Sequence, residues 1–151
     1  MASILSASLV KAAARRHGFD ACGLAEAGPV DARRQADVAR WLADGRHASM
    51  DYLVRHAAMR ADPRSVVPGA RTVVSLALNY YPACRPQAFD FAAYAYGRDY
   101  HDVVRSRLRS LLAELASNAG LAPDELGRGF CDTGPVDERY WAVCCGIGWW
   151  G

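Results

Sequence analysis

The sequence has a single lysine, an odd number of cysteines and no apolar run of the roughly 20 residues that a bilayer-spanning helix needs. Lys11 is that lysine, and arginine supplies every other cation of the 151-residue chain. Codon usage in a GC-rich genome explains this bias, and the abundance of alanine agrees. The functional alternative is phosphate recognition by planar guanidinium groups. A net charge of +2 gives no indication of nucleic-acid binding, and we expect no membrane partner.

The five cysteines, Cys22, Cys84, Cys131, Cys144 and Cys145, include no Cys-x-x-Cys pair. Their odd number argues against a disulfide framework, and the missing pair argues against a zinc or iron–sulfur site held by this chain alone. Buried free thiols in a reducing compartment are the simplest interpretation. We therefore expect no metal site in the chain itself.

The length suits one domain with a hydrophobic core, so residues 1–151 are predicted to form a single domain. The N-terminal segment places its basic residues after its apolar part, whereas a secretory signal places them before it. The segment is interpreted as an amphipathic first helix, and a cytoplasmic location follows as the default.

Helices are predicted to alternate with a few buried strands, which indicates an α+β fold built as a layered α/β sandwich. Residues 71–81 form the clearest strand, and their continuous apolar centre predicts burial on both faces. Pro82 and Pro86 should end it. The full set of expected elements is helices at 3–17, 29–44, within 46–60, at 101–119 and from Pro135, with strands at 19–25, 71–81 and 127–131, and glycines 18, 45 and 120 as helix terminators.

A dense polar and aromatic cluster precedes the long helix at 101–119, whose apolar stripe is Val104, Leu108, Leu111, Leu112 and Leu115. Asp99 is placed to cap that helix. The cluster is either an ordinary capped loop or a wall for a large flat ligand, because tyrosine offers a broad face with a polar edge. Its members are Tyr94, Tyr96, Arg98, Asp99, Tyr100 and His101.

Asp132 opens the triplet Asp-Thr-Gly, which also carries the catalytic carboxylate of aspartic proteases. Those enzymes need two such carboxylates on an all-β scaffold, whereas this chain has one triplet with a helix close behind it. The plainer interpretation is a turn, with Thr133 or Gly134 as the cap of the helix that Pro135 opens and with Asp137 and Glu138 in its first turn. Asp132 is still a candidate site residue, because it lies between a strand and a helix N-terminus.

Two further motifs carry weaker signals. Arg60 lies in a basic loop that leads into the strand at 71–81, where it pairs with a phosphate or carboxylate or is simply solvated. The stretch GIGWWG lacks the glycine spacing of a dinucleotide-binding loop and follows a helix rather than a strand, so no nucleotide loop is predicted there.

Five blocks in this order and spacing resemble the N-terminal domain of epoxyqueuosine reductase: Arg-Ala-Asp-Pro at 60–63, Tyr-Tyr-Pro at 80–82, Gly-Arg-Asp-Tyr-His at 97–101, Asp-Thr-Gly-Pro-Val-Asp-Glu-Arg at 132–139 and Gly-Ile-Gly-Trp at 146–149. The resemblance covers nearly the whole chain. It implies a nitroreductase-like, cobalamin-binding catalytic domain of an oxidoreductase that converts epoxyqueuosine to queuosine in tRNA. It also implies that electrons come from two [4Fe-4S] clusters in a C-terminal ferredoxin-like domain that this chain lacks, so the fragment alone is expected to be inactive.

The resemblance also assigns roles to single residues. Asp132 matches the family's catalytic aspartate, which would protonate the epoxide oxygen as it leaves carbon. Arg60 matches a cobalamin contact, and Asp132 is expected to contact the cobalamin as well. Ala92 lies where a small residue would let the backbone approach the corrin, and Tyr100 and His101 would form part of the same wall. An apolar corrin face would raise the pKa of Asp132, whereas a helix N-terminus would lower it.

Two other functions stay open at this point. One is a non-catalytic cobalamin carrier, and the other is a flavin-dependent enzyme of the nitroreductase type. In the leading interpretation the partners are tRNA and cobalamin, and the protein is a monomer in the cytoplasm.

Overall fold

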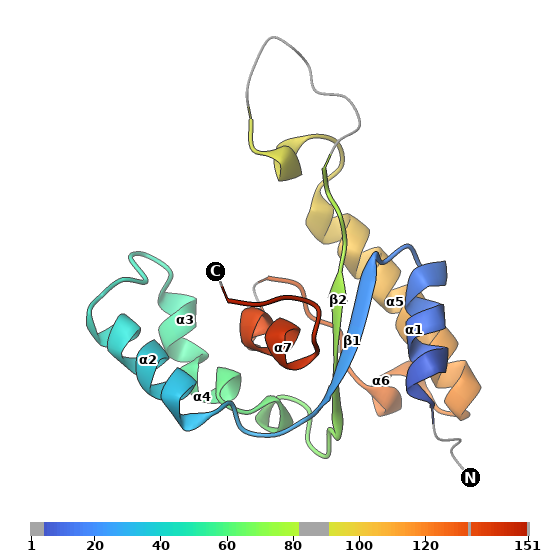
Figure 1. Ribbon diagram of the computed structural model, residues 1–151, viewed down its shortest axis with the longest axis horizontal. Helices are drawn as coiled ribbons and strands as arrows, with labels where there is room; N and C mark the ends of the chain where they lie inside the picture. Colours follow the sequence, from blue (N-terminus) through green and yellow to red (C-terminus); the bar gives the residue numbers. More distant parts are fainter. Residues whose placement is uncertain (1–4, 82–90, 133, 151) are drawn as a thin grey trace. The chain divides into compact units, whose positions relative to one another are not determined.

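The computed structural model describes residues 5–81, 91–132 and 134–150 (Figure 1). Pro82, Cys84, Pro86 and Thr133, which entered the sequence-based predictions, lie outside these residues. The chain divides into two compact units. The first is built from Met1–Cys22 and Leu76–Cys131, and the second from Gly23–Ser75 and Asp132–Gly151.

Two strands, β1 (Ala21–Glu26) and β2 (Thr72–Ala77), form a two-stranded sheet. The Asp20 N–H donates to the Ala77 carbonyl and the Ala27 N–H donates to the Arg71 carbonyl, both at 2.9 Å, so the strands are antiparallel.

The prediction that the second strand is buried on both faces is wrong. No residue of β2 is fully buried, and Val74 is 37% exposed. Within the described residues β2 pairs with one strand only, so its apolar centre is not enclosed as it would be inside a larger sheet. The ladder ends at Ala77, four residues before the predicted end at Tyr81.

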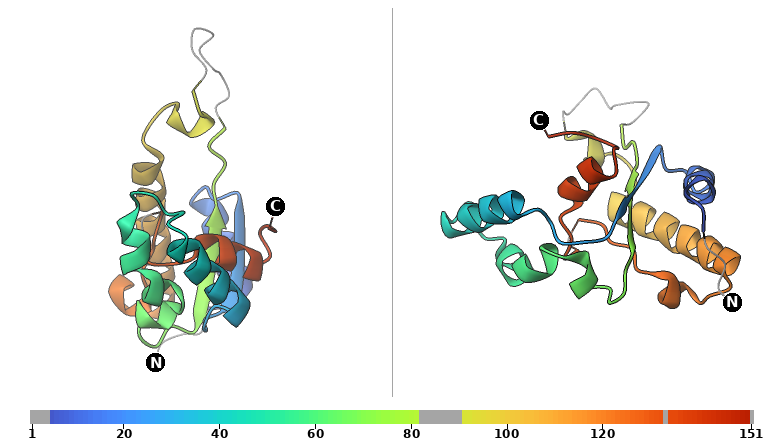
Figure 2. Two further views of the ribbon diagram at one scale, coloured as in Figure 1. Left: turned by 90° about the vertical axis from the view of Figure 1, so that its left-hand side faces the viewer. Right: turned by 60° about the horizontal axis from the view of Figure 1, so that its bottom comes forward.

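In the first unit, helix α1 (Ala7–Arg16) lies beside the long helix α5 (Tyr100–Ala119) (Figures 1 and 2). Ser6 caps α1 by accepting the Leu9 N–H at 3.2 Å. Small side chains allow the two helices to pack closely. The buried residues of the pair are Val10, Ala13 and Ala14 of α1 with Leu111, Leu115, Ala116 and Ala119 of α5.

The boundaries of α5 confirm the sequence prediction to within one residue. Asp99 accepts the His101 N–H at 2.8 Å as the N-terminal cap, and Gly120 ends the helix in the left-handed conformation with φ of +70°. Leu111 and Leu115 of the predicted stripe are buried, while Val104, Leu108 and Leu112 are half-buried. The short helices η2 (Ala93–Ala95) and α6 (Pro123–Leu126) flank α5 in the chain.

In the second unit, α2 (Ala32–Ala43) begins after Asp31, which caps it by accepting the Arg34 N–H at 2.8 Å. The predicted single helical piece within 46–60 is two helices, α3 (Asp51–Arg55) and α4 (Ala57–Arg60), which meet at His56. The short helix η1 (Pro63–Ser65) follows.

Helix α7 (Glu138–Cys144) completes the second unit and begins later than predicted. Its cap is Asp137, whose carboxylate accepts the Tyr140 N–H, whereas Gly134, Pro135 and Val136 form a bend. Asp137 therefore stands before the first turn and not inside it. Asp137 outcompetes the earlier positions because its short carboxylate reaches the N–H three residues on.

Two other predictions are wrong. Residues 127–131 form no strand, and within the described residues no neighbouring strand is available to pair with them. None of the described cysteines is fully buried: Cys144 at the end of α7 is exposed, and Cys22, Cys131 and Cys145 are half-buried.

In the part of the chain that the structure describes, no helix has the length and apolar character to cross a bilayer. The prediction of an α+β fold is confirmed.

Candidate functional site

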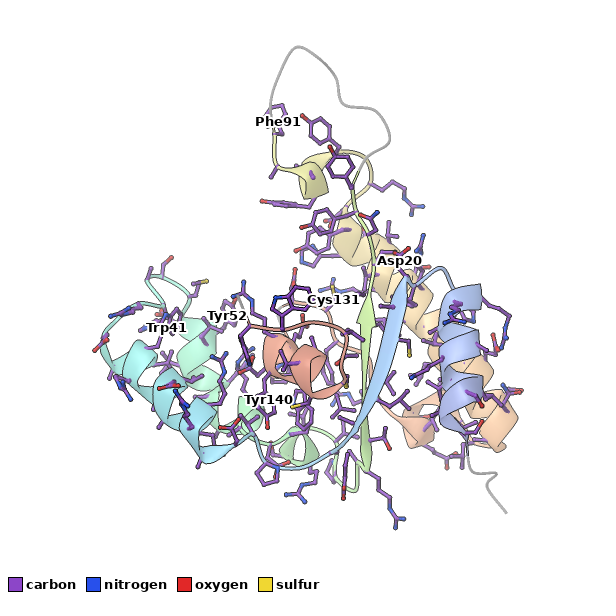
Figure 3. The ribbon with its side chains drawn as sticks, viewed as in Figure 1. Asp20, Trp41, Tyr52, Phe91, Cys131 and Tyr140 are labelled. Carbon is purple, nitrogen blue, oxygen red and sulfur yellow. The ribbon has the colours of Figure 1, made fainter. Side chains whose placement is uncertain are left out.

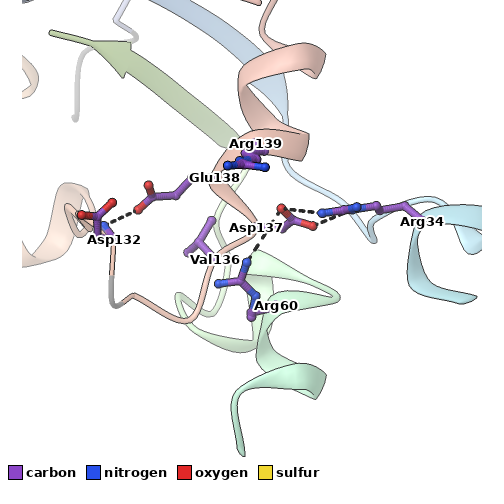
Figure 4. A pocket seen from close by; sticks show the side chains of 7 residues that line it. All are labelled: Arg34, Arg60, Asp132, Val136, Asp137, Glu138 and Arg139. Carbon is purple, nitrogen blue, oxygen red and sulfur yellow. Dashed lines mark hydrogen bonds and ion pairs between the residues drawn. The ribbon is translucent and has the colours of Figure 1, made fainter. Parts of the chain in front are cut away.

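A hollow of about 200 Å³ lies in the second unit, where the bend before α7 faces α4 and the start of α2 (Figure 4). Six of its seven lining residues are charged, and their formal charges cancel. The lining consists of Arg34, Arg60, Arg139, Asp132, Asp137, Glu138 and Val136. Such a lining suits a polar group that offers hydrogen-bond acceptors and donors together.

Asp137 is the buried anchor of this hollow, with 5% of its surface exposed. Its carboxylate binds Arg34 with two contacts, Nε to Oδ2 at 2.9 Å and Nη2 to Oδ1 at 3.3 Å. Arg60 approaches the same carboxylate, with Nη2 at 3.8 Å from Oδ1. Asp137 thus joins α2, α4 and the start of α7, and its buried charge is compensated from two sides.

Arg60 has a second contact, in which Nη1 donates to the Gly134 carbonyl at 3.4 Å. The Arg60 side chain is 21% exposed, so it stays partly open to a ligand. Both of its protein contacts, at 3.4 and 3.8 Å, are longer than the usual 2.8–3.0 Å of such bonds. A phosphate or amide oxygen at the usual distance would therefore bind Arg60 more strongly than these protein oxygens do.

Asp132 is exposed and has a left-handed backbone, with φ of +58°. Its N–H donates to Oε1 of Glu138 at 2.8 Å. Aspartate tolerates this conformation better than most residues, but it still costs of order 1 kcal/mol and persists only where its surroundings enforce it. Strain of this kind is common at functional sites.

Glu138 is exposed as a residue, yet its pKa is raised, chiefly because protein atoms around the carboxyl group disfavour the charged form. The N–H of Asp132 opposes this rise by stabilising the carboxylate. The negative charges of Asp132 and Asp137 add to the rise, and the positive charge of Arg60 reduces it. Glu138 is therefore the carboxyl group of the hollow that holds a proton to a higher pH than an ordinary glutamate.

The structure brings together two of the five predicted site residues. Arg60 and Asp132, 72 positions apart, line the same hollow. Ala92, Tyr100 and His101 belong to the first unit. Ala92 has an extended backbone just before η2, and the other two residues open α5.

Tyr100 and His101, both half-buried, belong to an aromatic cluster of the first unit. Their rings stack with centroids 4.1 Å apart, and Tyr94 meets Tyr100 edge to face at 5.9 Å. Tyr80 extends the cluster at 6.5 Å from Tyr94, and both are more than half exposed. Phe91, labelled in Figure 3, meets Tyr96 edge to face with ring centroids 6.3 Å apart.

Asp99 fixes the imidazole of this cluster, because its Oδ1 lies 3.0 Å from Nδ1 of His101. The His101 N–H and then its ring lower the pKa of Asp99. The cluster therefore offers broad apolar faces held by a charged cap, as expected for a surface that contacts a flat ligand.

Sequence reasoning missed Arg34 as a lining residue and assigned Asp137 and Glu138 only to a helix start. No local pattern marks Arg34 and Asp137, because their mutual contact joins residues 103 positions apart, whereas Glu138 meets Asp132 only six positions away. Among the described residues no three His, Cys, Asp or Glu side chains gather as a metal site, and Cys144 and Cys145 are not part of one.

Comparison with known proteins gives consistent results. The family described as "Epoxyqueuosine reductase QueG, DUF1730" matches residues 60–133. An epoxyqueuosine reductase from Cyclobacterium marinum is 42% identical over 147 residues, which are 95% of this chain and 46% of that protein. The chain thus spans somewhat less than half the length of this curated relative.

Two solved structures are also similar. The crystal structure of an epoxyqueuosine reductase with an epoxyqueuosine-modified tRNA-Tyr stem loop has a TM-score of 0.69 and 25% identity, covering 93% of this chain and 38% of that chain. The epoxyqueuosine reductase from Streptococcus thermophilus has a TM-score of 0.72 and 21% identity, with 96% and 40% covered, and shows the shared fold. Over nearly its whole length this chain is thus similar to part of the epoxyqueuosine reductases.

Proposed function

We propose that the chain forms the cofactor-binding and substrate-facing part of an oxidoreductase that reduces epoxyqueuosine to queuosine in tRNA. The observation that carries this proposal is the match of 95% of the chain, at 42% identity, to a curated epoxyqueuosine reductase. The similar solved structure that holds an epoxyqueuosine-modified tRNA stem loop supports tRNA as the substrate.

We propose cobalamin as the cofactor, on a nitroreductase-like fold. Cobalamin is a broad macrocycle edged with amide and phosphate groups. The hollow at about 200 Å³ is smaller than the roughly 300–1,000 Å³ of pockets that enclose drug-sized ligands. Its arginines suit a polar edge group, and the exposed tyrosines of the first unit suit a flat face. The hollow therefore fits one polar edge group of cobalamin, and the tyrosine cluster, taken by itself, fits a flat apolar face.

Within this proposal each predicted residue has a role that its position supports. Arg60 would bind an oxygen at the edge of the cofactor, because its guanidinium lines the hollow and makes only long contacts with protein. Tyr100 and His101 would pack against a face. Ala92 would permit close approach of the backbone, because it has no side chain beyond Cβ.

Removal of an epoxide oxygen gives an alkene and water, and it consumes two electrons and two protons. Bound cobalamin would supply the reducing power at the epoxide carbon. Asp132 would supply a proton to the oxygen as its bond to carbon breaks, because an unprotonated alkoxide is a poor leaving species. Asp132 lines the hollow and is an exposed residue, which supports this role.

We further propose that electrons come from [4Fe-4S] clusters held outside this chain, as the resemblance to epoxyqueuosine reductase implies. The protein would act as a monomer in the cytoplasm, where tRNA is modified and thiols stay reduced.

The deciding experiment is a reduction assay on the whole protein with an epoxyqueuosine-modified tRNA stem loop, an electron donor and cobalamin. Mass spectrometry should show the loss of one oxygen from the modified nucleoside. No conversion under conditions in which the curated relative from Cyclobacterium marinum is active would contradict the proposal.

An absorbance titration of the purified chain with cobalamin tests the cofactor separately. We expect a red-shifted or base-off spectrum, and Arg60→Ala should weaken binding by about 10- to 100-fold, the value of one charge-assisted hydrogen bond. Arg64→Ala is the matched control, because Arg64 pairs with Asp62 and does not line the hollow. A flat titration, or a protein that is yellow as purified, would favour the flavin alternative.

A further inference from the structure

The backbone conformation of Asp132 depends on a partner within its own segment. With φ of +58°, Asp132 is one of two described non-glycine residues in the left-handed region, the other being Ala48. The Asp132 N–H donates to Oε1 of Glu138 at 2.8 Å, which is a short bond to a charged acceptor. This bond spans the bend at 134–136 and joins its two ends.

Glu138 is itself held in place. It is the first residue of α7, directly after Asp137, whose buried carboxylate is fixed by Arg34 and Arg60. The backbone from which the Asp132 carboxyl projects, and with it the range of directions open to that group, is thus tied through Glu138 to contacts that begin at a buried ion pair. Because a displacement of about 1 Å at a reacting group can cost about 100-fold in rate, control of that direction has a functional consequence.

We propose that Glu138 is a positioning residue, whose carboxylate holds the backbone of Asp132 in the left-handed conformation and so aims the Asp132 carboxyl at the substrate. The inference rests on the proposed function, because it matters for catalysis only if Asp132 delivers the proton. It adds a residue to the site that the sequence motifs had assigned to a helix start.

Nuclear magnetic resonance tests the contact without reference to activity. In the wild-type chain the chemical shift of the Asp132 amide proton should change with pH, and part of that change should be absent in Glu138→Gln. The part that depends on Glu138 should have its midpoint above 4.5, the ordinary pKa of a glutamate, because crowding by protein atoms raises the pKa of Glu138. The groups that act on Glu138 and must be considered in the fit are Asp132, Asp137 and Arg60. An unchanged titration in the variant would overturn the contact.

Steady-state kinetics on the whole protein tests the role. Glu138→Ala, which removes the acceptor, should lower kcat by about 10- to 100-fold, the value of a hydrogen bond to a charged group. The affinity for cobalamin should change less than about threefold. Glu138→Gln keeps an oxygen that accepts the Asp132 N–H, so it should restore most of kcat. Equal losses of kcat in the two variants, or a parallel loss of cobalamin affinity, would overturn the positioning role.

Glu125→Gln is the matched control. Glu125 also accepts a backbone N–H, that of Ala122 at 2.8 Å, but it lies on α6 in the first unit. It should leave kcat and the Asp132 amide unchanged. Wild-type protein without reductase activity would instead overturn the proposed function, and the amide titration would then show whether the contact exists apart from that function.

Discussion

Arg34 binds the buried carboxylate of Asp137 through two nitrogens, at 2.9 and 3.3 Å, across 103 positions of sequence. Paired contacts of this kind fix both the distance and the plane of the two groups. They hold α2 against the start of α7, and both residues line the hollow.

Asp137→Asn should destabilise the chain by about 1–3 kcal/mol. Removing one partner of a buried ion pair costs about 3–5 kcal/mol, and the lower figure applies here because Arg34 and Arg60 are 30% and 21% exposed and regain some hydration. Asparagine still caps a helix well, so the loss of stability measures the removal of the charge and not the removal of the helix cap. Urea unfolding followed by circular dichroism measures the change.

The control for this prediction is Asp37→Asn. Asp37 also pairs with an arginine, Arg40 at 3.4 Å, but both side chains are more than half exposed. Such surface pairs contribute about 0–1 kcal/mol. Equal effects of the two variants on the unfolding midpoint would show that Asp137 has no special structural role.

Gly23→Ala should destabilise the second unit by about 1–3 kcal/mol or more, the usual cost of overpacking. An added Cβ would lie 2.0 Å from the carbonyl oxygen of Cys145, which is backbone and cannot rotate away. Gly28→Ala is the matched control, because a Cβ there meets nothing within 4 Å. Thermal unfolding of the two variants measures the difference, and a similar Tm for both would contradict the close packing of α7 on β1.

The contribution of Glu114 to stability should depend on pH. Hydrogen bonds from Arg16 and then His17 lower the pKa of Glu114. A lowered folded-state pKa gives stability that is present above the ordinary value of 4.5 and is lost as pH falls through the lowered value. The difference in unfolding midpoint between wild type and Glu114→Gln should therefore shrink as pH falls below about 4.5. A constant difference between pH 7 and pH 3 would contradict this ion pair.

Helix α5 shows what local signals determine. Its cap at Asp99, its terminator Gly120 and its apolar stripe are all contained in the segment itself, so its bounds are predictable to one residue. Arg60 and Asp132 line one hollow, and both had been identified from family motifs and not from local pattern.

The remaining features depend on contacts that no short segment encodes. The exposure of β2 depends on how many strands pair with it, which its apolar run does not indicate. The start of α7 is set by Asp137, whose carboxylate caps the helix and also binds Arg34. Burial of a charge is decided by its distant partners, so Asp137 resembled an ordinary helix-start carboxylate.

Asp132→Asn should lower kcat of the whole protein by about 10²- to 10⁴-fold, the range that a positioned proton donor contributes. Asparagine tolerates φ of +58° at least as well as aspartate, so the backbone and the Glu138 contact should persist. The variant therefore removes the transferable proton and little else, and its affinity for cobalamin should stay within about threefold of wild type. Asp124→Asn, an exposed carboxylate on α6, is the control and should leave kcat unchanged. Full activity of Asp132→Asn, measured as loss of oxygen from epoxyqueuosine, would exclude Asp132 as the donor.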